Sequence, residues 1–112
     1  MKTLLLQSDV GVVLETVLQT ESPFARMRGL LGRRGLPAGH AMWFRPCRSI
    51  HTCFMQFCID VIFLDKDKVV TDVRIGVKPW RVVIGAPGSY SVLEVQTGWL
   101  DDASLAIGTQ FY

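Results

Sequence analysis

Short apolar runs separated by turn residues recur along the whole chain. Residues 69–75 alternate between apolar and polar side chains, which is the period of a half-exposed strand. Residues 59–64 are nearly continuously apolar and rich in β-branched side chains, which favours a buried strand. Because the short polar segment Asp65-Lys66-Asp67-Lys68 joins them, we predict that the two runs form an antiparallel hairpin.

Other apolar runs predict the remaining elements. We predict strands over residues 41–44, 81–84 and 90–95, and one or two strands, as a hairpin, over residues 2–7 and 10–18. Residues 50–58 fit a strand or an extended loop, and residues 108–112 fit a last edge strand. One helix is predicted over residues 23–31, because Pro23 suits a first helical turn and Phe24 begins an apolar stripe at helical spacing.

These elements predict a mainly-β fold of the α+β kind, in which seven or eight short strands and one helix form a small barrel or sandwich. The chain has 112 residues, the size of one domain, so we predict a single domain over residues 1–112. With 49% hydrophobic and 20% charged residues, the composition is that of a chain with a core and not of a disordered one.

The same composition bears on location. No apolar run approaches the roughly 20 residues of a membrane helix, so no membrane partner is expected. The N-terminal apolar stretch is too short for the core of a signal peptide, and no small-residue cleavage site follows it. We therefore expect a cytoplasmic protein whose three cysteines, Cys47, Cys53 and Cys58, are reduced thiols.

The formal net charge of +2 is unevenly spread. Residues 22–59 contain six arginines and no acid, whereas the blocks on either side each carry a charge of −2. An arginine-rich block favours an anion site or a surface for an acidic partner, unless the arginines pair with acids brought close by folding. The acidic outer blocks and the lack of a recognised motif argue against nucleic acid as a partner.

The segment from Cys47 to Asp60 has the highest density of polar side chains that could carry chemistry. Its cysteines and His51 lack a C-x-x-C pair, so we predict neither a metal site nor a cofactor. His51 and Cys53 are two residues apart and would share a strand face. An enzyme hypothesis is therefore a small hydrolase that uses Cys53 or Thr52 as nucleophile, with His51 as base and Asp60 orienting it.

Asp60 heads an otherwise apolar strand, and a buried carboxylate needs a charged or hydrogen-bonding partner. Either Arg26 or Arg28 clamps it in a structural role, or it faces a ligand. Nearby aromatic and methionine residues form either the core or an apolar pocket whose mouth carries His51, Thr52 and an arginine. The apolar residues in question are Met42, Trp43, Phe44, Phe54, Met55 and Phe57.

Several stretches occur here in a characteristic order. They are Arg28-Gly29-Leu30-Leu31-Gly32-Arg33, Met42-Trp43-Phe44, Ser49-Ile50-His51-Thr52-Cys53-Phe54-Met55, Ile59-Asp60-Val61-Ile62-Phe63-Leu64-Asp65, Val92-Leu93-Glu94 and Gly98. In these stretches the sequence resembles the domain-of-unknown-function 192 family over about residues 10–112. The resemblance implies a compact mainly-β domain with one short helix and supplies no reaction. Cys58 and Thr109 depart from the Pro and Asp that the family often has there.

The resemblance and the residues together give a candidate ligand site. Its members are Arg28, His51, Thr52, Met55, Asp60 and Glu94. We expect a noncatalytic binding module with an arginine-rimmed pocket, built by residues 42–60, for a small anionic ligand or an acidic peptide. The hydrolase is one alternative. A structural domain whose edge strands pair with a partner protein is the other.

Overall fold

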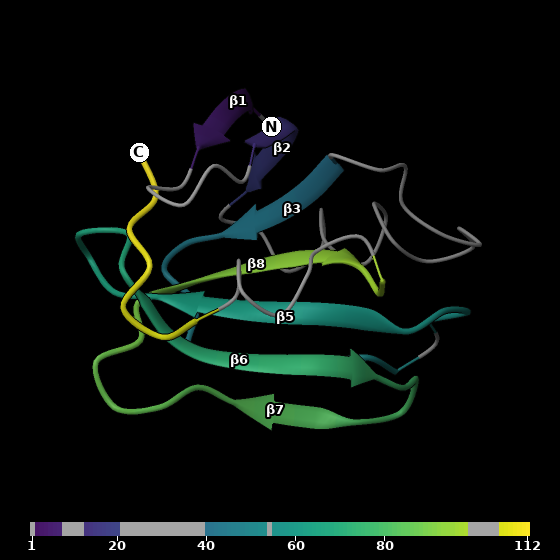
Figure 1. The fold of residues 1–112 in the computed structure, drawn as a ribbon. Coiled ribbons are helices and arrows are strands. Elements are labelled where there is room, and N and C mark those ends of the chain that lie inside the picture. The colour runs from purple at the N-terminus through teal and green to yellow at the C-terminus, as the bar shows by residue number, and fades with distance from the viewer. Residues whose placement is uncertain (1, 8–12, 21–39, 54, 99–105) are drawn as a thin grey trace.

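The computed structural model describes residues 2–7, 13–20, 40–53, 55–98 and 106–112. These ranges contain eight strands and no helix (Figure 1). The strands are β1 (Lys2–Gln7), β2 (Val13–Thr20), β3 (His40–Phe44), β4 (Ser49–His51), β5 (Ile59–Leu64), β6 (Val70–Val77), β7 (Val82–Ile84) and β8 (Ser91–Gln96). The predicted mainly-β fold is confirmed, and the helix predicted over residues 23–31 lies outside the described residues.

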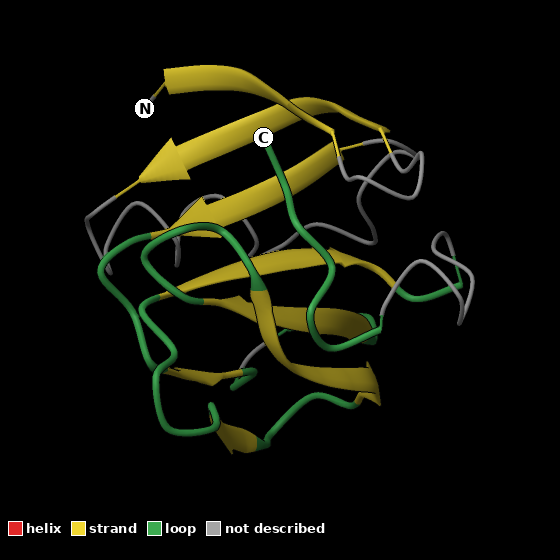
Figure 2. Ribbon diagram, turned by 60° about the vertical axis from the view of Figure 1, so that its left-hand side comes forward, coloured by secondary structure: helices red, strands yellow, loops and turns green. Residues whose placement is uncertain are grey.

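The strands form two sheets (Figure 2). The larger sheet has the order β1-β2-β3-β8-β5-β6, and the smaller one pairs β4 with β7. The larger sheet is open, with β1 and β6 at its edges, so of the two predicted architectures the packed sheets are found and the closed barrel is not. Its neighbouring strands are antiparallel except for β2 and β3, which are parallel.

Both predicted hairpins occur, as β1–β2 and β5–β6. The tight turn between β5 and β6 is built by one side chain, Asp65. Its Oδ1 accepts the backbone N–H of Asp67 at 2.8 Å and that of Val69 at 3.0 Å. A short carboxylate that bonds the backbone ahead of it is a common way to close a turn. Lys68 completes the turn with a φ of 63°.

Apolar side chains cover both faces of the part of the larger sheet formed by β3, β8, β5 and β6. One face buries Ala41, Trp43, Ile62, Leu64, Val70, Leu93, Val95 and Phe111. The other face packs against the small sheet and buries Met42, Phe44, Ile50, Met55, Phe57, Ile59, Val61, Phe63, Val77, Val83 and Val92. All six residues of β5 are buried because both of its faces are covered, which confirms the prediction for this run.

Two segments differ from the sequence-based expectation, and a third combines the two alternatives that were predicted for it. Of residues 50–58, only the start is regular strand, because β4 ends at His51. Residues 108–112 contribute a single isolated bridge, from Gln110 to Val69, and no named strand. The alternation in β6 is interrupted by a bulge, since Ile59 pairs with Val77 whereas Val61 pairs with Arg74. Gly76 lies in this bulge with a φ of 64°.

Candidate functional site

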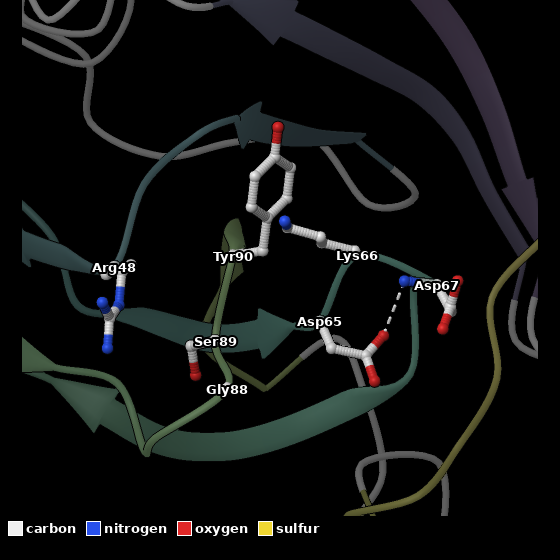
Figure 3. Close-up of a pocket in the computed structure, with 7 residues that line it drawn as sticks. All are labelled: Arg48, Asp65, Lys66, Asp67, Gly88, Ser89 and Tyr90. Atoms are coloured by element: carbon white, nitrogen blue, oxygen red, sulfur yellow. Dashed lines mark hydrogen bonds between the residues drawn. The ribbon is translucent and has the colours of Figure 1, made fainter.

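Three loops meet at one end of the larger sheet. Strands β3 and β5 both run antiparallel to β8, so the residues that follow β3 and β5 lie beside those that precede β8. A pocket of about 440 Å³ opens between these loops (Figure 3). It is lined by Arg48, Asp65, Lys66, Asp67, Gly88, Ser89 and Tyr90.

Positive charge is concentrated around this pocket. The loops at residues 45–48 and 65–69 carry four cations, Arg45, Arg48, Lys66 and Lys68, against the two carboxylates of Asp65 and Asp67. In the view of Figure 3, the amino group of Lys66 lies beside the ring of Tyr90, and Arg48 lies on the other side of the segment that carries Gly88, Ser89 and Tyr90. Neither of these two cations is paired with a carboxylate within the described part of the chain, where an ion pair joins Arg74 to Asp72 instead. The cations that face the pocket therefore keep their charge available.

Three of the four cations lie over aromatic rings. The Nζ of Lys66 lies 5.6 Å from the centroid of the Tyr90 ring. The guanidinium carbon of Arg45 and the Nζ of Lys68 lie 4.6 Å and 6.0 Å from the centroid of the Trp43 ring. Trp43 is itself fixed, because its buried Nε1 donates to the Ser91 hydroxyl at 3.0 Å. Such stacking positions a cation without neutralising its charge.

The loop before β8 is fastened to its neighbours. Pro87 and Gly88, whose φ is 92°, form a turn closed by the Ser89 N–H and the Ala86 carbonyl at 3.1 Å. The Tyr90 N–H donates to the Leu64 carbonyl at 2.7 Å. The hydroxyls of Ser89 and Thr71 are 2.8 Å apart. One wall of the pocket is therefore held by bonds to β5 and β6.

Asp72 of β6 supports the same loop. Its Oδ2 accepts the Ala86 N–H at 3.1 Å and the Nη2 of Arg74 at 3.1 Å, and its Oδ1 accepts the Nε of Arg74 at 3.3 Å. The hydrogen bonds from Arg74 lower the pKa of Asp72 below its ordinary value, and the carboxylate in turn raises the pKa of Arg74. Asp72 therefore stays ionised as it holds the loop.

Thr52 of the predicted site is fully buried, and its hydroxyl and both of its backbone groups form hydrogen bonds. Its hydroxyl donates to the Lys78 carbonyl at 2.6 Å and accepts the Arg81 N–H at 2.9 Å. Its own N–H donates to the Arg81 carbonyl at 2.9 Å, and its carbonyl accepts the Trp80 N–H at 3.1 Å. Thr52 thus fastens residues 78–81 to the end of β4, and its hydroxyl points into these bonds.

Other predicted residues in this segment have different surroundings. His51 is exposed on β4, whereas Met55 is buried in the core beneath the small sheet. Cys47, Cys53 and Cys58 are half-buried, and none of them forms a disulfide. Segment 42–60 supplies one side chain, Arg48, to the pocket described above, and most of its other apolar residues belong to the core.

The two predicted carboxylates, Asp60 and Glu94, are buried on opposite faces of the larger sheet. Asp60 lies opposite Val95 in the β5–β8 pair, and Glu94 lies opposite Val61. Val95 belongs to one core and Val61 to the other, and residues directly opposite in an antiparallel pair share a face. Because the small sheet covers the Glu94 face, His51 and Asp60 are separated by the larger sheet. The structure therefore does not bring this base and carboxylate together.

Asp60 has a structural partner set. Its Oδ1 accepts the Gly76 N–H at 2.8 Å and the Thr97 hydroxyl at 2.9 Å. The carboxylate thereby satisfies the backbone at the β6 bulge and joins β6 to the end of β8. The two arginines predicted to clamp it, Arg26 and Arg28, lie outside the described residues. The prediction that Arg28 belongs to the candidate ligand site therefore also lies outside them.

Six of the lining residues were not predicted as pocket residues, namely Asp65, Lys66, Asp67, Gly88, Ser89 and Tyr90. The first three were predicted to lie in a turn, but turn composition does not tell which other segment a turn will meet. The pairing of β5 with β8 brings the two segments together, and it was not predictable from local patterns. Within the described ranges, no group of three or more His, Cys, Asp or Glu side chains could hold a metal ion. In the same ranges no helix has the length and apolar character needed to span a membrane.

Comparison with known proteins gives one family and a shared fold. A family model described as Uncharacterized ACR, COG1430 (DUF192) matches residues 7–111. A UPF0127 protein of Thermococcus sibiricus is 37% identical over 62 residues, which are 55% of this chain and 40% of that protein. The chain therefore matches less than half the length of this relative.

Two solved structures are similar along nearly the whole chain. A protein of unknown function from Novosphingobium aromaticivorans has a TM-score of 0.80 and 18% identity, covering 98% of this chain and 84% of its own. A protein from Sinorhizobium meliloti has a TM-score of 0.78 and 19% identity, covering 96% of this chain and 89% of its own. At these identities the likeness shows a shared fold.

Proposed function

Because the chain belongs to the uncharacterised DUF192 family, we propose from its own geometry that it is a noncatalytic binding module for a small anionic ligand. The ligand would occupy the pocket between the loops at residues 45–48, 65–69 and 85–90. The observation that carries this proposal is the pair of cations, Arg48 and Lys66, which line the pocket without a carboxylate partner among the described residues.

The chemistry of the pocket favours a compact ligand with a carboxylate or phosphate group. The guanidinium of Arg48 offers a planar fork of donors, which suits two oxygens of one anion. Lys66 is a point charge that stacks on the Tyr90 ring, so a ligand can approach it from the open side. Tyr90 adds an aromatic surface for an apolar part of the ligand.

The acidic residues at the pocket are consistent with this ligand. The Oδ1 of Asp65 is directed into the β5–β6 turn by its two backbone bonds. The pocket lining therefore sets two cations, Arg48 and Lys66, against two carboxylates, of which that of Asp65 is already committed to the turn. Neighbouring Arg45 and Lys68 add to the positive potential that would draw an anion towards this end of the sheet.

The test is a titration of the full chain with inorganic phosphate and with a dicarboxylate, at constant ionic strength, followed by the amide signals of a nitrogen-15-labelled sample. We expect the signals of Lys66, Gly88, Ser89 and Tyr90 to shift together and to saturate. Arg48→Ala should weaken binding by about tenfold or more, the value of one charge-assisted hydrogen bond.

Arg81→Ala is the matched control, because Arg81 is also an exposed arginine but lies at the other end of the β4–β7 pair. It should leave the affinity unchanged. Equal losses in Arg48→Ala and Arg81→Ala would show only a general charge effect and overturn the proposal. So would shifts that do not saturate for either anion.

A further inference from the structure

The outer edge of β7 has unpaired backbone groups. Two bonds flank the β4–β7 ladder, from the Gly85 N–H to the Arg48 carbonyl and from the Thr52 N–H to the Arg81 carbonyl, each 2.9 Å long. Hydrogen-bonded and non-hydrogen-bonded pairs alternate in an antiparallel ladder. Residues 49/84 and 51/82 are therefore the non-bonded pairs, and the N–H and C=O groups of Val82 and Ile84 point away from β4.

No described residue forms a hydrogen bond with these outward groups. Val82 and Ile84 are 73% and 69% exposed, so the edge is open to solvent as well as unpaired. Their side chains share one face of the strand, since they are two residues apart. Trp80, which is 59% exposed, lies just before the strand. An exposed edge with large apolar side chains is a template for pairing with another extended chain.

The edge is also held in place. The hydrogen bonds between Thr52 and residues 78–81 fix the segment that leads into β7, including Trp80 with its φ of 66°. A left-handed conformation is rare for a bulky residue and persists only where the surroundings impose it. A partner strand would therefore meet a preformed edge and would not have to order it.

We propose that β7 binds an extended, acid-rich segment of a partner protein, which adds as a third strand to the β4–β7 sheet. Main-chain bonds to Val82 and Ile84 would supply affinity, and apolar residues of the segment would cover their side chains. This surface shares one cation, Arg48, with the anion pocket, whose other lining residues are 65–67 and 88–90.

The positive charge around the β7 edge favours one kind of binding partner. Residues 45–53 and 73–90, which contain both strands of the small sheet, include cations and no acidic residue. Asp72, which bonds the Ala86 N–H near the end of β7, is paired with Arg74. The exposed Arg48, Lys78 and Arg81 belong to these segments. In a two-fold pairing of β7 with a second copy, Arg81 of one copy would lie two strands, or about 10 Å, from Arg48 of the other. This repulsion disfavours a second copy and favours a partner that alternates acidic and apolar residues.

The test measures amide hydrogen exchange at Val82 and Ile84 in the full chain. The probe is a capped peptide of three Glu-Val repeats, and its control is the same peptide with Lys for Glu. Without peptide, both amides should exchange rapidly, whereas Val83, which pairs with Ile50, should be protected. The Glu-Val peptide should slow exchange at Val82 and Ile84 by about tenfold or more, and the Lys-Val peptide should not.

Two variants make the result specific. Val82→Glu should abolish the protection, whereas Ile75→Glu, which adds the same charge at an exposed apolar position of the edge strand β6, should leave it intact. Lys66→Ala should weaken anion binding and not peptide binding, so the two proposals can fail separately. The inference is overturned if the Glu-Val peptide gives no protection at millimolar concentration, or if both peptides protect equally. Protection that rises with protein concentration alone would also overturn it, in favour of a second copy.

Discussion

The hydroxyl of Thr52 lies 2.9 Å from the backbone nitrogen of Arg81, and both partners are held by further bonds between the two segments. A buried hydroxyl that donates to one carbonyl and accepts from one N–H has used its donor. Thr52 is therefore best described as the fastening point of the 78–81 segment, from which β7 starts.

Thr52→Val should lower the free energy of unfolding by about 2 kcal/mol. The substitution preserves the shape of the side chain but leaves the Lys78 carbonyl and the Arg81 N–H without their partner. Urea denaturation of the two proteins measures the difference. Thr52→Ser keeps the hydroxyl and should lower the free energy of unfolding by less than half as much. If Thr52→Ser cost as much as Thr52→Val, the methyl group would contribute as much to stability as the two hydrogen bonds, and the proposed fastening role of the hydroxyl would be wrong.

Asp60→Ala should be destabilising by about 2–4 kcal/mol, because the Gly76 N–H and the Thr97 hydroxyl both lose their acceptor inside the protein. Asp60→Asn retains an acceptor oxygen of the same shape and should recover most of the loss. Asp67→Ala, at an exposed position, is the control for removing a carboxylate. Thermal unfolding of the three variants distinguishes a hydrogen-bonding role from a charge role, since the latter would make the Asn variant as unstable as the Ala variant.

The strands could be predicted from local pattern, but their neighbours could not. Residues 59–64 and 69–75 gave two strands and their hairpin, because a short turn leaves antiparallel pairing as the simple outcome. The insertion of β8 between β3 and β5 depends on contacts between residues far apart in sequence. The bulge at Gly76 was missed for a related reason, since it depends on Asp60 in the neighbouring strand.

The candidate site shows the same limit. Asp60 was singled out because a carboxylate in an apolar strand needs a partner, and it has one, although the partners found are a backbone N–H and a hydroxyl. Asp60 and Glu94 were grouped from the resemblance, and sequence alone does not show that a sheet separates them. Arg48 was part of the arginine block, but the loops that complete its pocket come from later in the chain.

Gly85→Ala should destabilise the fold by about 1–3 kcal/mol through overpacking. A Cβ at this position would lie 2.6 Å from Cδ1 of the Phe63 ring and 2.8 Å from the Ser89 hydroxyl. Phe63 is fully buried, so its ring cannot move away without disturbing the core. Combining Gly85→Ala with Phe63→Leu should cost less than the sum of the two single changes, as measured by chemical denaturation. Strict additivity would contradict the proposed contact.

Asp72→Asn should make stability less dependent on acid pH. Because the folded state lowers the pKa of Asp72 below 3.8, its contribution is present above that value and is lost as pH falls through the folded pKa. We expect the free energy of unfolding of the wild type to exceed that of Asp72→Asn by about 1 kcal/mol at pH 7. This difference should shrink as the pH falls below about 4. Denaturation curves from pH 3 to 7 test this. A gap that stays constant with pH would assign the effect to the lost Ala86 bond and not to ionisation.

The position of β8 has a consequence for synthesis on the ribosome. β3 and β5 each pair with β8 and not with each other, so neither has its inner neighbour until residues 91–96 have left the exit tunnel. The nascent chain can form its two hairpins early, but the apolar faces of β3 and β5 must wait for the last named strand. A growing chain exposes such surfaces to wrong partners. Translation arrest before β8 should therefore produce a species that chaperones hold and proteases cut, whereas release of the complete strand closes the core that faces the small sheet and leaves the other core to be completed by Phe111.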